Sequence, residues 1–213
     1  VFLEPLTRAQ VDDFINERSK RDRLKSYNLD PMNKINLIGP PGNGKPSLAE
    51  VVASELKLPF LRLKFSGVIN SYLGESFKTL DTVFKLVAKQ PCILFIDEFD
   101  VIGVSRAIKE DIGEMRRVVA CLLLHIYAMS SDSVLSIASN HPELLDKAVW
   151  RRFDISVTLD KPDKINIMRF VKSLCDKYRQ YFSDSDAFKE PFFGLSYSEA
   201  ESLCLAIIRK RVL

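Results

Sequence analysis

The sequence has no closely spaced cysteines. Its four cysteines, Cys92, Cys121, Cys175 and Cys204, lie far apart among apolar residues. Zinc sites and redox motifs need closely spaced ligands, so neither is expected here. Buried thiols in a reducing compartment are the simpler interpretation, and they favour a cytoplasmic protein.

Long apolar runs and a strong net charge are also missing. No run approaches the roughly 20 apolar residues that cross a bilayer, and the N-terminus has no signal-peptide pattern. The formal net charge is only +3 on 213 residues, which gives no reason to expect binding to nucleic acid or to an anionic membrane. Hydrophobic residues make up 46% and charged residues 28%, a balance typical of a globular protein.

From residue 35 to about residue 160, short apolar runs alternate with helical stretches. This alternation is typical of a parallel sheet with crossover helices. The predicted fold class is therefore α/β, a five-stranded parallel sheet with flanking helices. Strands are predicted at 35–38, 60–65, 93–96, 134–138 and 155–159, and helices near 47–56, 75–88 and 113–128.

Two further segments flank this region. Residues 1–30 mix apolar and charged positions, which predicts an N-terminal linker or helical segment. Helical periodicity replaces the strand signals near residue 160, so 31–160 and 161–213 are expected to form a large α/β subdomain and a small α-helical subdomain. Ser196 and Glu199 form a capping-box pattern at the start of the second helix of this small subdomain.

A glycine-rich segment joins the first predicted strand to the following helix. Glycines let backbone N–H groups surround phosphate oxygens, while the lysine adds charge and the helix N-terminus adds its dipole. A plain Gly/Pro-rich turn would not explain the strand–loop–helix order, so a binding site for the phosphates of ATP or ADP is predicted. Its residues are Gly39, Pro40, Pro41, Gly42, Asn43, Gly44, Lys45, Pro46 and Ser47.

Pro46 departs from the pattern of such loops, in which the residue after the lysine is a Ser or Thr that binds Mg²⁺. Proline has neither that hydroxyl nor the N–H, although it is tolerated in the first turn of a helix. Ser47 lies one residue further on, about 100° around the helix axis, and cannot take the same position. The sequence therefore predicts an intact fold with impaired ATP hydrolysis.

The apolar strand 93–96 ends in two adjacent acids, Asp97 and Glu98. Ligands bind at the carboxyl ends of the strands in open α/β sheets, and paired acids are costly unless a cation or solvent meets them. Asp97 is predicted to hold Mg²⁺, through water. Glu98 is predicted to orient and activate the attacking water.

Together, the glycine-rich loop and the acidic pair resemble those of the AAA family of ATPases, and further matches extend along nearly the whole chain. The similarity is to protein-remodelling members, such as the katanin- and spastin-like and the bacterial AAA ATPases. It implies a P-loop NTPase sheet, the cofactors ATP and Mg²⁺, and assembly into a ring, which is a hexamer in the family. It also implies a protein substrate, and it leaves open both a separate protease or effector partner and a truncation of the small subdomain.

Three polar residues match catalytic positions of the family. Asn140, just after the strand 134–138, resembles the polar sensor beside the γ-phosphate and the attacking water. Arg151 and Arg152 resemble the arginine-finger segment that acts on a neighbour's nucleotide, and guanidinium charge suits that role. Which arginine is the finger stays open, as does a surface pair that only stabilises a helix end.

Two segments resemble the pore loops of the family. An aromatic side chain can grip many polypeptide sequences through apolar and stacking contacts. The segment 105–114 resembles a second pore loop, with a solvated loop as an equal alternative. The first pore loop comprises Tyr72, Leu73 and Gly74.

Residues 194–199 resemble the Gly-x-Ser-Gly-Ala-Asp turn that lies near adenine in the family. Tyr197 and Ser198 replace its two small residues. The resemblance thus brings this turn into the nucleotide site and leaves its contact with the base open.

The leading hypothesis is ATP-driven remodelling or threading of a protein substrate in a ring, with hydrolysis impaired by Pro46. The alternative is a nucleotide-binding assembly scaffold with little or no ATPase activity, although an inactive protein need not keep Asp97, Glu98 and the arginine pair. A nucleic-acid motor fits less well because the chain has no clustered basic stripe. A small-molecule kinase would need an acceptor pocket that the sequence does not indicate.

Overall fold

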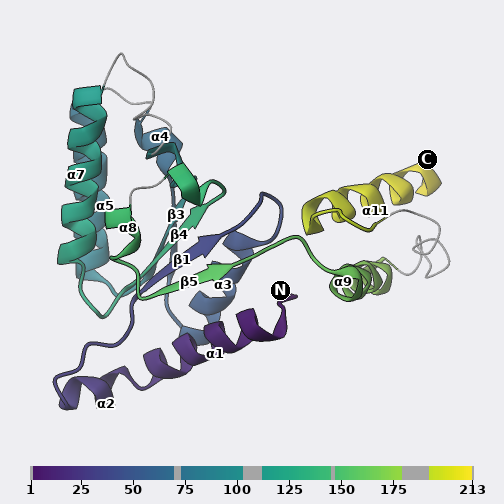
Figure 1. The fold of residues 1–213 in the computed structure, drawn as a ribbon, viewed down its shortest axis with the longest axis horizontal. Helices are drawn as coiled ribbons and strands as arrows, with labels where there is room; N and C mark the ends of the chain where they lie inside the picture. Colours follow the sequence, from purple (N-terminus) through teal and green to yellow (C-terminus); the bar gives the residue numbers. More distant parts are fainter. Residues whose placement is uncertain (1, 70–72, 103–111, 145–146, 179–191, 213) are drawn as a thin grey trace.

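A parallel sheet forms the centre of the computed structural model, which describes residues 2–69, 73–102, 112–144, 147–178 and 192–212 (Figure 1). The strand order is β2-β3-β4-β1-β5, and all neighbouring strands are parallel. The α/β class and the five predicted strands are confirmed. The strands are β1 (Lys34–Ile38), β2 (Phe60–Lys64), β3 (Ile93–Asp97), β4 (Val134–Ser139) and β5 (Ile155–Thr158).

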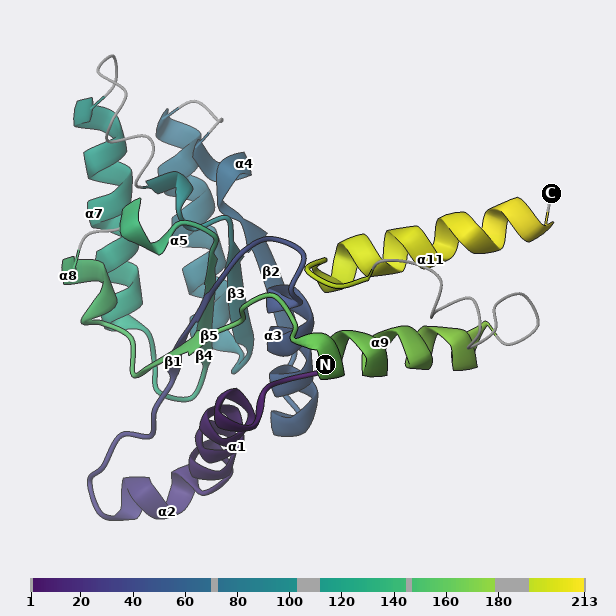
Figure 2. The ribbon, with the colours of Figure 1, turned by 45° about the vertical axis from the view of Figure 1, so that its right-hand side comes forward.

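Helices cover both faces of the sheet (Figures 1 and 2). One face packs against α5 (Leu73–Lys89) and α7 (Ile112–Ala128), and the other against α1 (Pro5–Ser19) and α3 (Lys45–Leu56). The predicted helices at 47–56, 75–88 and 113–128 are therefore present. The short helix α2 (Arg21–Ser26) lies in the N-terminal segment predicted as linker or helical. Three other short elements were not predicted: α4 (Phe65–Ile69), η1 (Pro142–Leu144) and α8 (Lys147–Trp150).

Strand β3 shows why this sheet is buried on both sides. Ile93 and Phe95 pack into the core under α1 and α3, whereas Leu94 and Ile96 pack into the core under α5 and α7. All four side chains are fully buried. A strand that is apolar at every position suits the centre of a doubly covered sheet, so its polar end at Asp97 marks the edge where the core stops.

A buried arginine of α1 forms hydrogen bonds to the segment before β4. Val11 and Phe14 of α1 join the core around α3, and Arg18 donates hydrogen bonds to the carbonyls of Ser131 (2.5 Å) and Asp132 (2.9 Å). Burial lowers the pKa of Arg18. The N-terminal segment thus packs on the sheet as a helix, while the proposed subdomain boundaries near residues 30 and 160 stay a prediction.

The last two described helices, α9 (Lys164–Lys177) and α11 (Tyr197–Val212), pack against each other through their own apolar core. They lie side by side, away from the sheet (Figure 2). The Ser196–Glu199 capping box is confirmed: the Ser196 N–H donates to Glu199 (2.7 Å) and the Glu199 N–H to Ser196 Oγ (3.3 Å). Among the described residues no helix is long and apolar enough to cross a membrane.

Candidate functional site

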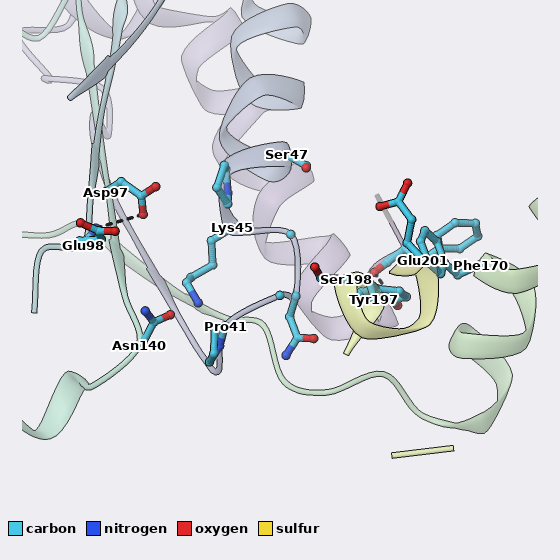
Figure 3. A pocket seen from close by; sticks show the side chains of 15 residues that line it. Pro41, Lys45, Ser47, Asp97, Glu98, Asn140, Phe170, Tyr197, Ser198 and Glu201 are labelled. Atoms are coloured by element: carbon cyan, nitrogen blue, oxygen red, sulfur yellow. Dashed lines mark hydrogen bonds between the residues drawn. The ribbon is translucent and has the colours of Figure 1, made fainter. Parts of the chain in front are cut away.

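A cavity of about 550 Å³ lies at the carboxyl edge of the sheet, between the loop after β1 and the start of α11 (Figure 3). Its walls come from the glycine-rich loop, the acidic pair, Asn140, and residues near both ends of the chain. It thus joins segments that are far apart in the sequence. The lining residues are Phe2, Pro41, Gly42, Asn43, Gly44, Lys45, Pro46, Ser47, Asp97, Glu98, Asn140, Phe170, Tyr197, Ser198 and Glu201.

Two glycines allow the loop to pass close to its neighbours. Gly39 has φ 138°, and a Cβ there would collide with the carbonyl oxygen of Leu159. Gly42 has φ 80°, and a Cβ there would lie 2.7 Å from Ser196 Oγ, just before α11. L-residues avoid positive φ and neither position has room for a side chain, so only glycine fits. The loop therefore lies tightly between the end of β5 and the start of α11.

Lys45 is the buried cation of this loop. Its side chain is 5% exposed, and Nζ donates to the carbonyls of Gly39 (2.6 Å) and Pro40 (3.0 Å). Burial lowers the pKa of Lys45, while Asp97 and Asp100 act in the opposite direction. The same ammonium donors can bond to phosphate oxygens in place of these carbonyl oxygens. Lys45 Nζ is therefore held where a bound anion would meet it.

Pro46 occupies the first turn of α3 without breaking the helix. Gly44, with φ 83°, is the N-cap, Lys45 is the first helical residue, and the Leu48 N–H donates to Gly44 O (2.8 Å). The expected intact fold is thus observed. Ser47 is exposed, and its hydroxyl is directed away from Asp97 (Figure 3). No hydroxyl of this turn therefore faces the acidic pair.

The Asp97 carboxylate has a partner that the sequence analysis missed. Asp97 Oδ2 forms an ion pair with Arg62 Nη2 at 2.6 Å, and Asp97 Oδ1 accepts the Glu98 N–H at 3.0 Å. Arg62 extends from β2, where it lies opposite Phe95 in the register, and its guanidinium lies 5.9 Å from the centre of the Phe95 ring. A charged residue inside the otherwise apolar start of β2 was the available signal.

Glu98 has an unusual backbone conformation, with φ 57°. A non-glycine residue in this region costs about 1–3 kcal/mol and persists only where its surroundings enforce it. Here the Phe99 N–H donates to Ala138 O (3.0 Å), and Glu98 Oε2 accepts a 2.5 Å hydrogen bond from Ser66 Oγ. Ser66, in α4, is a second site residue that the sequence analysis did not identify.

The residues near Asp97 do not fit the usual magnesium site of a phosphate loop. Pro46 offers no ligand oxygen, and both oxygens of Asp97 already accept hydrogen bonds from the protein. Within the described ranges, no group of three or more His, Cys, Asp or Glu side chains is arranged to hold a metal ion. The predicted role of Asp97, to hold Mg²⁺ through water, therefore stays a prediction.

Asn140 follows β4 and completes the polar end of the cavity. Its backbone N–H donates to Oδ2 of the buried Asp100 at 3.1 Å, which fixes the turn after the strand. The side chain faces the cavity near Lys45 (Figure 3). Lys45, Asp97, Glu98 and Asn140 are thus brought together at one end, as the order of the strands requires.

Three aromatic rings close the other end of the cavity. Phe170 of α9 and Tyr197 of α11 make an edge-on contact at 4.9 Å between ring centres, and Phe2 lies 6.0 Å from Phe170 and 6.3 Å from Tyr197. The Tyr197 hydroxyl donates to Phe2 O at 3.2 Å, and burial raises the pKa of Tyr197 to about 12. Neither Phe2 nor Phe170 was predicted as a site residue.

The start of α11 also contacts the glycine-rich loop directly. The Ser198 N–H donates to Gly42 O at 3.0 Å. This hydrogen bond and the tight fit of Gly42 against Ser196 connect the two ends of the cavity.

Arg151 and Arg152 lie outside this cavity. Both are exposed, in the turn after α8, and Arg152 lies 6.0 Å from the ring centre of the exposed Tyr127. Asp154 anchors the following residues, because its Oδ2 accepts the N–H groups of Asn33 (2.7 Å) and Lys34 (2.8 Å). The two arginines thus face outward from a fixed segment.

The predicted pore loops fall mostly outside the described residues. Tyr72 and residues 105–111 are among those not described, and Leu73 and Gly74 form the first residues of α5. The role of Tyr72, Leu73 and Gly74 in gripping a polypeptide therefore stays a prediction.

Comparisons with known proteins find a matching family model and several similar sequences. A family model described as "ATPase family associated with various cellular activities (AAA)" matches residues 35–161. An uncharacterised AAA family ATPase from Sinorhizobium fredii is 36% identical over 199 residues, 93% of this chain. A peroxisomal ATPase, PEX6, from Dictyostelium discoideum is 35% identical over 80% of the chain, and an ATP-dependent zinc metalloprotease, FtsH, from Clostridium perfringens is 39% identical over 64%.

The matched regions are only parts of these relatives. The alignments cover 60% of the Sinorhizobium protein, 15% of the Dictyostelium protein and 20% of the Clostridium protein. The family-model match at residues 35–161 spans the glycine-rich loop, the acidic pair, Asn140 and the arginine pair.

Proposed function

The chain belongs to the AAA family of ATPases, and on this premise we propose that it is the ATP-binding module of a ring assembly that remodels or threads a protein substrate, with its own hydrolysis impaired by Pro46. The observation that carries the proposal is the cavity itself. One end gathers Lys45, the acidic pair and Asn140, and the other end is aromatic. This distribution of charge and apolar surface matches a nucleoside triphosphate.

The phosphates would bind at the polar end. Backbone N–H groups of residues 42–45 and the dipole of α3 favour negative charge there, and Lys45 supplies the neutralising cation. Glu98 would orient the attacking water as a general base, with Asn140 beside it. Because the residues around Asp97 do not fit the usual metal site, no step of this proposal is assigned to Mg²⁺.

The base would bind at the aromatic end. Stacking of a base on an aromatic side chain is worth about 1–3 kcal/mol, and Phe170 and Tyr197 offer such surfaces in the cavity wall. Glu201 lines the same end and can accept hydrogen bonds from ribose hydroxyls or from an exocyclic amine. With the phosphates at the polar end and the base at the aromatic end, the nucleotide could bind in only one orientation.

The proposed ring assembly is supported by the position of the arginine pair, and the proposed protein substrate is supported by the relatives. Arg151 and Arg152 are exposed and absent from the cavity wall of their own chain, which suits action on the nucleotide of a neighbouring subunit in a hexameric ring. Relatives that include an ATP-dependent zinc metalloprotease support a protein substrate, gripped by Tyr72, with a separate protease or effector as a further partner. A cytoplasmic location is part of the same proposal.

The second candidate function is an assembly scaffold that binds nucleotide without turning it over. Pro46 and the ion pair between Arg62 and Asp97 favour it. The intact Glu98, Asn140 and arginine pair favour a competent enzyme with a weakened site.

Steady-state hydrolysis of ATP with Mg²⁺, over a range of protein concentrations, separates these two functions. Pro46→Thr restores the missing hydroxyl, and we expect turnover to rise at least about tenfold, which corresponds to roughly 1.4 kcal/mol of barrier. Glu98→Gln in the Pro46→Thr background is the matched control and should abolish the gain. Rising specific activity with concentration would support trans-acting arginines.

Equal turnover in the unmodified chain and Pro46→Thr would remove the proposed impairment. If no variant hydrolyses ATP under conditions where it binds nucleotide and assembles, the scaffold function replaces the enzyme.

A further inference from the structure

Two independent features alter the same part of the cavity. Pro46 removes a hydroxyl from the first turn of α3, and Arg62 of β2 forms an ion pair with Asp97. The first is a change of sequence, and the second is visible only in the arrangement of the strands. Both lower the capacity of this site for a divalent cation.

The ion pair is well supported by its surroundings. The Arg62 guanidinium packs over the fully buried Phe95, which in turn stacks on Phe60 at 5.8 Å between ring centres. The Asp97 side chain is only 17% exposed and uses its second oxygen for the Glu98 N–H. Such a pair is better shielded from water and salt than one between two fully exposed side chains.

The charges in the cavity explain what this pair does for a nucleotide. In a phosphate site a bound metal ion is normally the largest local charge, and it offsets both the phosphates and the nearby acid. A triphosphate placed beside an unpaired Asp97 without metal would face like charge. Here the Arg62 guanidinium already offsets the charge of Asp97.

We propose that Arg62 takes over the charge-balancing part of the metal ion, so that this chain binds ATP and ADP almost independently of Mg²⁺. This inference rests on the proposed nucleotide site but not on hydrolysis. It assigns a positioning role to Arg62, which acts through Asp97. The ligand class is a metal-free nucleoside di- or triphosphate.

The test is the dissociation constant of ATP measured by calorimetry, once with excess Mg²⁺ and once with EDTA. For the unmodified chain we expect the two values to agree within about threefold, well under the tenfold that corresponds to 1.4 kcal/mol. Arg62→Gln should weaken binding in EDTA by about tenfold, because a charge-assisted partner is lost. Pro46→Thr combined with Arg62→Gln should show the strongest preference for Mg²⁺.

A matched control isolates the cause. Arg8→Gln removes an arginine whose side chain is 67% exposed in a helical pair with Asp12 and which does not line the cavity. It should leave both affinities unchanged.

The outcomes separate this inference from the proposed function. Absence of ATP binding in both buffers would overturn the nucleotide site and the inference together. Tight binding that needs Mg²⁺ would keep the nucleotide site and overturn the inference, as would an unchanged affinity ratio in a folded Arg62→Gln. If Arg62→Gln does not fold, the two measurements on the unmodified chain still decide the question.

Discussion

The two ends of the cavity differ in how the chain builds them. The polar end comes from short segments at the ends of β1, β3 and β4, and it holds Pro46 and the ion pair between Asp97 and Arg62. The aromatic end comes from Phe2, Phe170 and Tyr197, which only the packing of α9, α11 and the N-terminal segment brings together. The end that would carry the chemistry departs from the family pattern at Pro46, and the end that would bind the base departs from it at Tyr197 and Ser198.

Under the proposed function, Pro46 would affect hydrolysis more than nucleotide binding. Affinity can draw on both ends, whereas hydrolysis depends on the polar end alone. Substitutions that affect one end but not the other therefore test the comparison.

The largest effect is expected where the two ends touch, at Gly42. Gly42→Ala and Gly44→Ala place a side chain at similar positive φ values, 80° and 83°, which costs about 1–2 kcal/mol for each. Only at residue 42 does the new Cβ meet Ser196 Oγ, whereas at residue 44 nothing lies within 4 Å. We expect Gly42→Ala to cost about 1–3 kcal/mol more in unfolding free energy, from overpacking, and also to weaken ATP binding.

Chemical denaturation and ATP calorimetry on these two variants provide the measurement, with Gly44→Ala as the matched control. Equal losses in both would mean that the contact between the loop and α11 does not couple the two ends.

An intermediate effect is expected at the aromatic end alone. Tyr197→Ala removes a stacking surface and should weaken ATP binding by about tenfold, from the lower part of the 1–3 kcal/mol range for base stacking. Tripolyphosphate has no base and should bind to Tyr197→Ala as it binds to the unmodified chain. Competition assays with both ligands check this. An equal loss of affinity for tripolyphosphate would mean that the phosphates, and not the base, bind at the aromatic end.

The smallest effect concerns pH. Burial raises the pKa of Tyr197 to about 12 from its ordinary value of 10.0, so the folded state favours the neutral hydroxyl that donates to Phe2 O. The stability linked to this group is complete below pH 10 and is lost as the pH rises through 12. The free energy of unfolding, measured from pH 9 to pH 12, should therefore decline less steeply with pH in Tyr197→Phe than in the unmodified chain. Identical slopes would contradict this.

The polar end was predictable because its residues follow strand ends. In a parallel sheet these ends meet at one edge, so Lys45, Asp97 and Asn140 are expected together once the strands are recognised. Arg62 and Ser66 were missed because their contacts depend on which strand neighbours β3 and on the short helix α4, and neither is apparent from local pattern. A basic residue in an apolar strand was the only hint.

The aromatic end was not predictable by the same reasoning. Tyr197 was noted as an unusual residue in the turn before α11, but nothing in the sequence connects it with Phe170 or with Phe2, 195 positions away. Their contact depends on how two helices and the N-terminal segment pack, which strand periodicity does not encode. The arginine pair and the pore loop are a third case, because their predicted partners belong to other chains and one chain cannot show those contacts.

The position of Phe2 has a practical consequence for protein production. Its carbonyl accepts the Tyr197 hydroxyl and its ring forms part of the cavity wall, while α11 carries the opposite end of the chain away from the cavity (Figure 2). An affinity tag fused directly before Phe2 would lie next to the cavity wall. A tag fused beyond α11 leaves that wall intact.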